Sequence, residues 1–319
     1  MKMRVFSILL LALMFTGIVT VSAQDAVECE AGFRAVTDAN GTDVCLPEAP
    51  ERVIALMESD LDALLALGVD VVGTTNGRGQ STPPRYLSEY LPEALPVVGN
   101  LYQPNLEAVL ALDPDLILMG GFNDEDVLAQ LNAIAPVFNT LNAGEDWKTQ
   151  FERVGDALNM QDEVEAFIEA YDERAAEMGE ALEAEEPLQF IVARWSADGP
   201  QLMAPINFSS LILTDLGMVP PVEIPELAGE HQHTAPLSLE NVGLLDVDWA
   251  FIGTLQSEGE AVEALEDAID TPLFQALDVV KDERVVFIDG SLWTSVGGPL
   301  AALAVLDDVE AALLAVEAE

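Results

Sequence analysis

Short apolar runs alternate with amphipathic stretches along most of the chain. Residues 52–56 ("RVIAL") and 69–73 ("VDVVG") predict buried strands, and the stretch 59–68 between them has the spacing of a helix. Farther along, residues 188–194 ("LQFIVAR") predict another strand, and a helix is predicted at 208–217. Strands that alternate with helices favour an α/β fold with mostly parallel sheets.

One helix-turn-strand pattern occurs twice. Residues 105–119 read "NLEAVLALDPDLILM", and residues 238–252 read "SLENVGLLDVDWAFI". Each copy begins with a residue that favours a helix N-cap, Asn105 or Ser238, and continues through a helix to an acidic turn and an apolar strand. The copies share Leu106/Leu239, Glu107/Glu240, Val109/Val242, Leu112/Leu245, Asp113/Asp246 and Asp115/Asp248. The repetition predicts two α/β lobes built on the same plan.

Residues 146–186 predict a helical connection between these lobes. Apolar residues recur there at roughly helical spacing, namely Phe151, Val154, Leu158, Val164, Phe167, Ile168 and Tyr171. Gly155 and the "NMQD" segment, 159–162, are points at which the helix can be interrupted. We expect the N-terminal lobe at 51–145 and the C-terminal lobe at 187–319. A rigid helical connection predicts modest closure of the lobes instead of a wide hinge motion.

The N-terminus has the pattern of a secretory signal peptide. A basic start at Lys2 and Arg4 precedes an apolar run that ends in small residues at 21–23 ("VSA"). We therefore expect a signal peptide at 1–23 that is cleaved after Ala23. An uncleaved anchor helix is the alternative, because the apolar run is nearly long enough to span a bilayer.

The following segment, 24–50, contains both cysteines of the chain. Cys29 and Cys45 flank the turn-rich sequence "TDANGTD" at 37–43. In an exported protein such a pair is expected to form a disulfide, and closing a loop of this size contributes ~3 kcal/mol to stability. A reactive or metal-binding pair is the alternative.

The charge of the chain narrows the function classes. There are 57 acidic and 12 basic residues, a formal charge of −45 at pH 7, which repels nucleic acid and anionic lipid. The common enzyme motifs are also missing from the sequence: there is no Gly-x-Ser-x-Gly elbow, Walker loop, His-Glu-x-x-His or Gly-x-Gly-x-x-Gly. A hydrolase built on two carboxylates stays open, because 57 acidic residues offer too many pairs to single one out.

Four segments in a fixed order resemble a known group of proteins. Residues 50–56 ("PERVIAL"), 105–118, 238–252 and 271–313 are similar to the iron-siderophore substrate-binding proteins of ABC importers, relatives of the vitamin B12 and haem binders. The similarity covers roughly 28–316. It implies two Rossmann-like lobes with mostly parallel sheets, joined by a single long α-helix, with the ligand in the cleft between the lobes.

The resemblance also implies a function. It predicts a monomer, without catalysis and without an intrinsic cofactor, that is secreted, periplasmic or associated with the cell surface. This protein would capture a ferric siderophore and deliver it to the permease subunits of an ABC transporter. In the family, a glutamate at the tip of each lobe docks onto arginines of the permease, and the repeat places Glu107 and Glu240 at these positions. The alternative is that each glutamate only stabilises its own helix dipole, by ~0.3–1 kcal/mol.

An anionic ferric siderophore requires cations and aromatic faces in the cleft. Arg194 ends a predicted strand and is followed by Trp195, which places both where an α/β sheet presents ligands; Arg194 also matches an arginine that family members use on siderophores. Arg78 and Arg85 lie in the polar loop 74–87, from which both can reach the cleft. The alternatives are an ion pair with an acid for Arg194 and solvated positions for the two loop arginines.

Two aromatic residues are further candidates for the cleft. Tyr102 lies in "GNLYQPN", directly before the first repeat copy, and in the family this position is at the approach to the cleft. Trp293, in "DGSLW", occupies the corresponding place in the other lobe. Both could cover apolar parts of a ligand, and core packing is the alternative for Trp293.

The chain has two histidines, His231 and His233, in the segment "GEHQHTAP". This segment precedes the second repeat copy as "GNLYQPN" precedes the first, so we expect the two loops to face each other across the cleft. Some catecholate-binding relatives use a histidine of this loop to complete the coordination of iron. Alternation in an extended loop predicts that only one of the two points at the ligand, and a pair of solvated histidines is the alternative.

Other ligands are compatible with the same fold. A haem or cobalamin binder is the nearest alternative, with a histidine of "HQH" as an axial ligand of haem iron. A zinc or manganese binder needs three or four protein ligands, which the two histidines and neighbouring acids supply only in principle. The His-rich loop that such metal binders often carry is missing from the sequence.

Overall fold

The computed structural model describes residues 27–121, 124–182, 184 and 186–314. The predicted signal peptide at 1–23 lies outside the described residues. Within the described ranges, no helix is long and apolar enough to cross a membrane.

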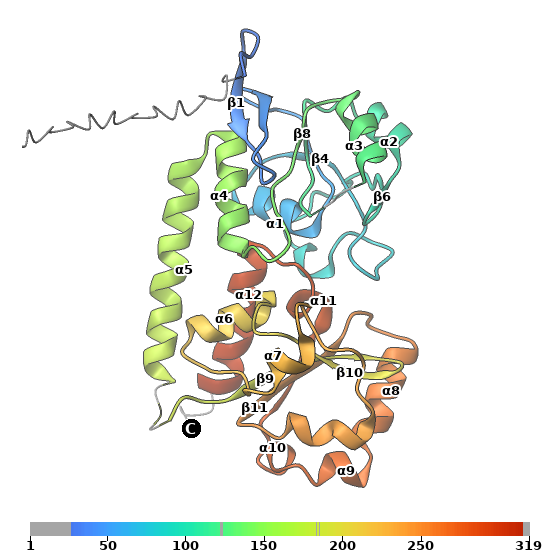
Figure 1. The fold of residues 1–319 in the computed structure, drawn as a ribbon, viewed down its shortest axis with the longest axis vertical. Helices are drawn as coiled ribbons and strands as arrows, with labels where there is room; N and C mark the ends of the chain where they lie inside the picture. The colour runs from blue at the N-terminus through green and yellow to red at the C-terminus, as the bar shows by residue number, and fades with distance from the viewer. Residues whose placement is uncertain (1–26, 122–123, 183, 185, 315–319) are drawn as a thin grey trace, which may run out of the picture.

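Within the described residues, two four-stranded sheets form the centres of two lobes (Figure 1). The N-terminal sheet consists of β3 (Val53–Ala55), β4 (Val71–Thr74), β7 (Leu116–Leu118) and β8 (Val137–Phe138). The C-terminal sheet consists of β9 (Phe190–Ser196), β10 (Gly199–Leu202), β11 (Trp249–Thr254) and β12 (Val285–Asp289). Their spatial orders are β4-β3-β7-β8 and β10-β9-β11-β12. When the strands of each sheet are taken in chain order, both sheets therefore have the same spatial arrangement.

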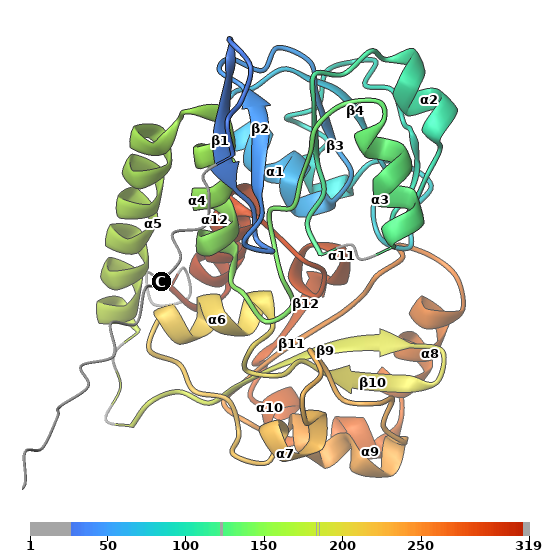
Figure 2. The same cartoon turned by 45° about the horizontal axis from the view of Figure 1, so that its top comes forward.

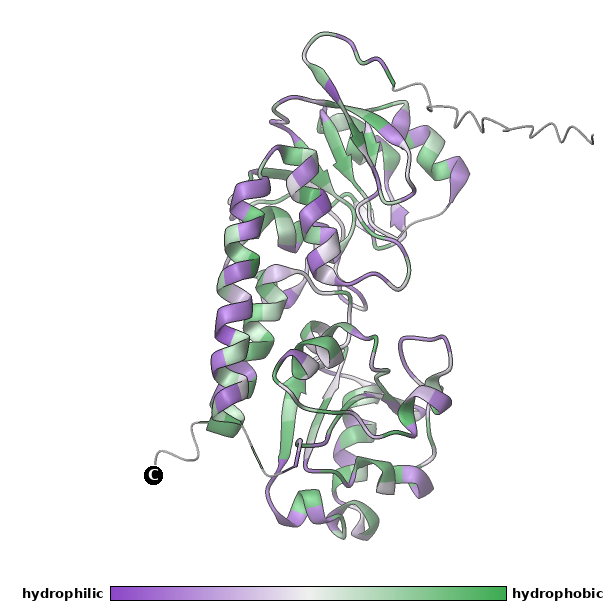
Figure 3. Cartoon of the chain, turned by 60° about the vertical axis from the view of Figure 1, so that its left-hand side comes forward, coloured by the Kyte–Doolittle hydropathy of each residue, from purple (hydrophilic) through white to green (hydrophobic). Residues whose placement is uncertain are grey.

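The pairing in these sheets is mostly parallel, which confirms the predicted fold class. All neighbours in the N-terminal sheet are parallel, and in the C-terminal sheet the edge strand β10 pairs antiparallel with β9. Strands β3 and β7 are buried along their whole length, as expected when helices cover both faces of a sheet. Figure 3 shows these inner strands as hydrophobic.

Helices and short hairpins surround each sheet. Those of the N-terminal lobe are α1 (Glu58–Ala66), the 3₁₀ turn η1 (Arg85–Leu87), the hairpin β5 (Gly99–Asn100) and β6 (Gln103–Pro104), α2 (Leu106–Ala111) and α3 (Glu125–Asn132). Those of the C-terminal lobe are α6 (Phe208–Asp215), α7 (Ile224–Ala228), the 3₁₀ helix η2 (Leu239–Leu245), α8 (Glu260–Ile269), α9 (Pro272–Gln275), α10 (Asp278–Lys281), α11 (Gly290–Trp293) and α12 (Pro299–Val309), which continues into a π-helical turn at Glu310–Leu314.

The two copies of the sequence repeat fold alike at their acidic turns. The carboxylate of Asp115 accepts hydrogen bonds from the backbone N–H groups of Glu51 and Arg52, at 2.8 and 3.0 Å, just before β3. At the equivalent place in the other lobe, Asp248 accepts from the N–H of Gln189 at 2.7 Å, just before β9. The repeated aspartate therefore joins the end of the helical segment to the start of the first strand in each lobe.

The helical parts of the two copies differ. Asn105 caps α2 as predicted, because its side chain accepts from the N–H groups of Glu107 and Ala108. The predicted side-chain cap at Ser238 is wrong, since its hydroxyl accepts from the side chain of Asn241 instead. The second copy is a 3₁₀ helix, and it contains Gly243, which lowers helix propensity.

The predicted connection at 146–186 contains two helices, α4 (Trp147–Leu158) and α5 (Gln161–Ala181). The break lies in the "NMQD" segment, where Asn159 adopts a left-handed conformation with φ 59°. Gly155 does not interrupt α4; a Cβ there would lie 2.6 Å from Val164, so glycine allows α4 and α5 to approach closely.

Helix α5 is the long connecting helix that the resemblance implied. Its 21 residues span ~30 Å at 1.5 Å per residue. It runs beside both lobes in Figure 1, with hydrophilic and hydrophobic residues alternating around it in Figure 3. The lobe limits 51–145 and 187–319 stay a prediction.

Helix α12 makes a second connection between the lobes. Asp62 of α1 is fully buried and accepts from the N–H groups of Leu300 and Ala301, at 2.7 and 3.0 Å, in the first turn of α12. Gly298 permits this approach, because a Cβ there would lie 2.8 Å from the carboxyl carbon of Asp62. The largest cluster of buried apolar residues also extends through both lobes. These contacts agree with modest closure, which stays a prediction.

A hairpin precedes the N-terminal sheet. Its strands are β1 (Phe33–Thr37) and β2 (Asp43–Pro47), paired antiparallel, and Figure 2 shows them next to α4. The predicted disulfide between Cys29 and Cys45 is confirmed. The hairpin is attached to the lobe by Val36 and Leu46, which are buried in the main apolar cluster.

Candidate functional site

A cavity of about 540 Å³ lies between the lobes. In the N-terminal lobe it begins at the carboxyl ends of two neighbouring parallel strands, where Met57 follows β3 and Gly121 follows β7. This is the place where open α/β sheets bind ligands. The cavity is also lined by Arg78, Tyr102 and 141–145 of this lobe, by Asp146, Trp147 and Gln150 at the start of the helical connection, and by 206–208, Leu211, 230–233 and 294–297 of the C-terminal lobe.

Aromatic side chains form part of the cavity wall. The predicted Tyr102 lines it from the β5–β6 turn, with φ 64° and 44% of its surface exposed. Trp147, at the start of α4, and Phe208, at the start of α6, also line it and are largely buried. Sequence reasoning missed Trp147 and Phe208. Both begin a helix that follows a strand of the sheet, and this position is the signal that could have identified them.

Arg78 is the predicted arginine that reaches the cavity. Its Nη2 donates to the hydroxyl of Tyr102 at 3.3 Å, and its backbone N–H donates to Oε1 of Glu58 at 2.6 Å. Glu58 is almost completely buried, and burial raises its pKa to about 7, opposed by the hydrogen bond and the charge of Arg78. The loop that carries Arg78 is thereby fixed to the first turn of α1.

Arg194 lies directly behind the cavity wall. It is 7% exposed, and its guanidinium donates to Oε1 of Gln201 at 3.0 and 3.1 Å and to the carbonyl of Thr294 at 3.4 Å. Thr294 lines the cavity, whereas Arg194 itself does not. Burial, together with the charge of Arg78, lowers the pKa of Arg194 to about 10.

Within the described residues, neither of these two guanidinium groups forms an ion pair with a carboxylate, although the charge of Arg78 acts on the buried Glu58. Among the described residues, the ion pairs with carboxylates are made by Arg85, Lys148, Arg153, Arg174 and Lys281. Arg78 and Arg194 instead raise each other's electrostatic energy, in a chain of formal charge −45. Two guanidinium groups that no ion pair neutralises therefore lie in or directly behind the wall of the cavity.

Both histidines line the cavity from the C-terminal lobe, and Tyr102 lines it from the N-terminal lobe, which is compatible with the predicted facing of the two loops. Alternation along the loop predicted that only one histidine would point at the ligand. Both histidines nevertheless line the cavity, together with Glu230 and Gln232. His231 is exposed, and His233 is half-buried.

The protonation of His233 follows from its contacts. Its Nδ1 lies 2.8 Å from the carbonyl oxygen of Thr234, which can only accept, and 3.3 Å from the side-chain amide nitrogen of Gln201, which can only donate. The shorter contact favours the tautomer with the proton on Nδ1 and the lone pair on Nε2. Burial lowers the pKa of His233, and the charges of Arg194 and Arg78 act in the same direction. A neutral imidazole with an unprotonated Nε2 can accept a hydrogen bond or coordinate a metal.

Three predicted site residues lie elsewhere. Trp195 is 2% exposed and packs edge-to-face on Phe274, because neighbouring residues of a strand point to opposite faces and Arg194 takes the cavity side. Trp293 is 0% exposed, stacks on Phe251 at 4.7 Å and donates to Asp308, so its role is core packing. The prediction of a ligand contact is wrong for both tryptophans.

Arg85 also does not line the cavity. Its guanidinium donates to the carbonyl of Leu255 at 3.2 Å and forms an ion pair with Asp289 at 2.7 Å. Both partners belong to the C-terminal lobe, so Arg85 connects the lobes instead of facing the ligand space.

A buried aspartate that sequence reasoning missed organises the floor of the cavity. Asp60 accepts from the N–H of Gly120, the hydroxyl of Thr140 and the side-chain amide of Gln150, a lining residue, at 3.0, 2.5 and 2.8 Å. Burial raises its pKa to about 6, against the effect of these donors. One carboxylate thus joins α1, α4 and the segments that follow β7 and β8.

The two glutamates proposed for docking are both exposed. Glu107 lies in the first turn of α2, and Glu240 lies in the first turn of η2. Their positions at equivalent places in the two lobes are compatible with contact to a partner, while the helix-dipole alternative predicts the same exposure.

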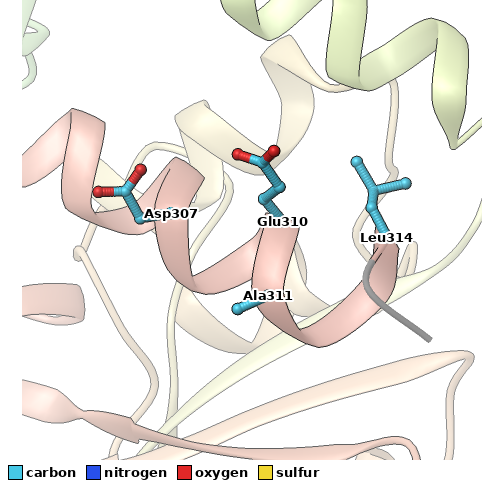
Figure 4. Close-up of a pocket in the computed structure, with 4 residues that line it drawn as sticks. All are labelled: Asp307, Glu310, Ala311 and Leu314. Atoms are coloured by element: carbon cyan, nitrogen blue, oxygen red, sulfur yellow. The ribbon is translucent and has the colours of Figure 1, made fainter. Parts of the chain in front are cut away.

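A second hollow lies away from the cleft, at the C-terminal end of α12. Asp307, Glu310, Ala311 and Leu314 line it (Figure 4). Its two carboxylates already form ion pairs with Arg174 of α5, at 2.7 and 2.6 Å. In the part of the chain that the structure describes, no group of three or more histidine, cysteine or acidic residues is arranged to hold a metal ion.

Comparison with known proteins gives a consistent result. The sequence model of a family described as periplasmic binding protein matches residues 53–292. The chain is 28% identical over 285 residues to the probable siderophore-binding lipoprotein YfiY of Bacillus subtilis (strain 168), covering 87% of this chain and 86% of that protein. It is also 28% identical over 268 residues to the achromobactin-binding periplasmic protein of Dickeya dadantii (strain 3937), with coverages of 82% and 85%.

Solved structures show the same architecture. SirA of Staphylococcus aureus, complexed with staphyloferrin B, superposes with a TM-score of 0.77 at 25% identity, covering 88% of this chain and 98% of SirA. The petrobactin-binding protein YclQ of Bacillus subtilis superposes with a TM-score of 0.73 at 20% identity, with coverages of 88% and 98%, which is a likeness in fold.

Proposed function

The chain belongs to the periplasmic binding protein family, and from this premise we propose that it captures a ferric siderophore in the interlobe cavity and delivers it to an ABC importer. The family consists of substrate-binding proteins that work with ABC transporter permeases. The protein acts outside the cytoplasm as a monomer, without turnover and without a cofactor of its own; the iron belongs to the cargo.

The observation that carries the proposal is the pair Arg78 and Arg194. Keeping two guanidinium groups near each other, one of them buried and neither in an ion pair with a carboxylate of the described residues, costs the ligand-free protein free energy. An anionic chelate in the cavity offsets this cost, because forked guanidinium donors bind carboxylate, catecholate and hydroxamate oxygens well. The volume of about 540 Å³ is that of a small-molecule site.

The relatives support a siderophore as the anionic ligand. Two of them are named as a probable siderophore-binding lipoprotein and an achromobactin-binding periplasmic protein. SirA, with the same fold at 25% identity, was solved with staphyloferrin B. Tyr102, Trp147 and Phe208 supply aromatic faces for the apolar parts of such a molecule.

We assign the iron contact, if a chelate leaves a coordination position open, to His233 and not to His231. The short contact between Nδ1 and the carbonyl of Thr234 favours the tautomer of His233 that has its lone pair on Nε2. The lowered pKa keeps this lone pair unprotonated at neutral pH. Within the described residues, no side-chain hydrogen bond orients the ring of His231, whose backbone N–H donates to the carbonyl of Ala228.

Glu107 and Glu240 are proposed to dock the loaded protein onto the permease. They occupy matching places in the two copies of the repeat, one in each lobe, and both are exposed. A permease with one cationic site for each lobe would contact both glutamates at once. Docking would therefore depend on the position of one lobe relative to the other.

A binding panel tests the proposed function. Quenching of tryptophan fluorescence is measured with ferric carboxylate, catecholate and hydroxamate siderophores, and with haem, cobalamin and Zn²⁺. Trp147 on the cavity wall serves as the reporter, with the Trp147→Phe variant as the control that identifies its signal. We expect saturable quenching by at least one ferric siderophore. Saturation by haem, cobalamin or Zn²⁺ with no response to any siderophore would overturn the proposal.

A further inference from the structure

One irregular loop supplies much of the cavity wall. Residues 139–146 connect β8 to α4 without regular secondary structure, and residues 141–146 all line the cavity. A segment without helix or strand hydrogen bonds needs other partners to hold one conformation. The position of this loop therefore depends on the elements packed around it.

The tip of the N-terminal hairpin is one of these partners. The N–H of Ala39 donates to the carbonyl of Asn139 at 2.9 Å, and the side-chain amide of Asn142 donates to the carbonyl of Ala39. The amide of Asn139 in turn donates to Oδ1 of Asn142 at 3.2 Å. The backbone N–H and carbonyl of Ala39 thus hold two residues of the loop, Asn139 and Asn142. Asn142 itself lines the cavity.

The hairpin tip has a fixed conformation of its own. Oδ1 of Asp38 accepts from the N–H groups of Asn40 and Thr42, both at 2.9 Å. Behind the tip, five residue pairs join β1 to β2, and the disulfide fixes Cys29 to Cys45 of β2. The hairpin is therefore a preformed element and not a second flexible loop.

Helix α4 holds the loop from the other side. Arg153 donates to both carboxylate oxygens of Glu145 at 2.6 Å and to the carbonyl of Thr140 at 3.1 Å. Oε2 of Glu145 also accepts from the N–H of Asn142 at 2.6 Å. The charge of Asp38 acts favourably on Arg153 as well. The loop is thus held between the hairpin tip and α4, with Asn142 bonded directly to the tip and linked to α4 through Glu145.

We propose that the disulfide-linked hairpin, residues 29–47, is a positioning element that fixes the cavity loop 139–146 and thereby sets the ligand affinity of the cavity. The statement on affinity rests on the proposed function. The hairpin lies before residue 53, where the family match begins, so a segment outside the matched region controls the shape of the binding site.

Hydrogen exchange of the ligand-free protein tests the positioning directly. Ala39→Pro removes the N–H that bonds to Asn139. We expect amides of 139–146 to exchange about fivefold faster, the effect of losing roughly one hydrogen bond, while β9 and β11 exchange as in the wild type. Asn40→Ala is the matched control, because this exposed neighbour has no side-chain hydrogen bond in the described residues. Unchanged exchange of the loop in Ala39→Pro would overturn the proposal.

The paired variant Cys29→Ala/Cys45→Ala gives an independent perturbation that leaves the tip sequence intact. We expect it to speed exchange of the loop in the same direction, and both variants to bind ferric staphyloferrin B, the probe used, about fivefold more weakly. Faster loop exchange with unchanged affinity would overturn the control of affinity. If the wild type binds no siderophore, the proposed function fails, while the exchange of the ligand-free protein still decides whether the hairpin positions the loop.

Discussion

Replacement of Arg194 with methionine is expected to separate ligand affinity from stability. The lowering of the Arg194 pKa to about 10 corresponds to ~3 kcal/mol in the free energy of the folded, ligand-free protein. We reduce this to ~1–2 kcal/mol, because water in the open cleft screens the charge. Methionine keeps much of the apolar stem of arginine but loses the hydrogen bonds to Gln201 and Thr294. This loss of ~1–2 kcal/mol offsets the free energy gained by removing the unfavourable charge. The free energy of unfolding should therefore change by less than ~1 kcal/mol.

Binding should respond much more strongly to the same change. Arg194 lies directly behind the cavity wall, so it acts on an anionic chelate through its charge, which the surrounding protein screens less than bulk water does. The Kd for an anionic ferric siderophore should therefore rise more than tenfold, or ~1.4 kcal/mol. The Kd for an uncharged ferric trihydroxamate should change less than ~threefold, because no anionic oxygen then needs the cation.

Isothermal titration calorimetry measures the Kd, and urea unfolding measures the free energy of unfolding. Arg284→Met is the matched control, since Arg284 is exposed and the substitution changes the net charge equally. An unchanged Kd for the anionic chelate would refute the role of Arg194. A loss of more than ~3 kcal/mol of unfolding free energy would refute the argument that its charge is unfavourable in the ligand-free protein.

Three further outcomes are expected. Glu107→Ala combined with Glu240→Ala should abolish iron uptake by cells while the purified protein binds its siderophore unchanged; lost binding would contradict the docking role. Asp62→Ala should lower the free energy of unfolding by ~2–4 kcal/mol in urea melts, because two N–H groups of α12, one buried and one partly buried, lose their acceptor. The exposed cap variant Asp124→Ala should cost only ~1 kcal/mol, and equal losses would argue against a special role for Asp62. Burial raises the pKa of Asp62 to about 6, so between the ordinary carboxyl pKa and pH 6 the folded protein binds a proton that the unfolded chain has released. Stability should therefore fall as the pH rises through this range, and Asp62→Asn should flatten the slope; an equal slope in both proteins would count against this.

Local pattern was sufficient to predict the fold class, and the repeat explains why. The aspartates at 115 and 248 follow helical segments at the same spacing and bond to the start of the first strand in each lobe. The predicted helix at the second copy failed locally, because Ser238 bonds to Asn241 and the segment is a 3₁₀ helix. Such a choice depends on small energy differences that sequence spacing does not report.

The candidate site was predicted less well, for reasons that differ between residues. Strand alternation already implied that Arg194 and Trp195 face opposite sides, so Trp195 could have been assigned to the core from the sequence. The burial of Trp293 and the interlobe bond of Arg85 depend on partners far away in the chain. The same holds for Asp62, whose partners in α12 lie 238 and 239 residues later.

The most direct test of the central claim is the position of the iron atom. Crystals grown with ferric staphyloferrin B and measured at the iron absorption edge give an anomalous peak wherever the chelate binds. We expect one peak inside the interlobe cavity, between the side of Arg78 and Tyr102 and the side of His233. A peak confined to another surface, or a protein that takes up no ferric siderophore while binding haem in the same cavity, would contradict it.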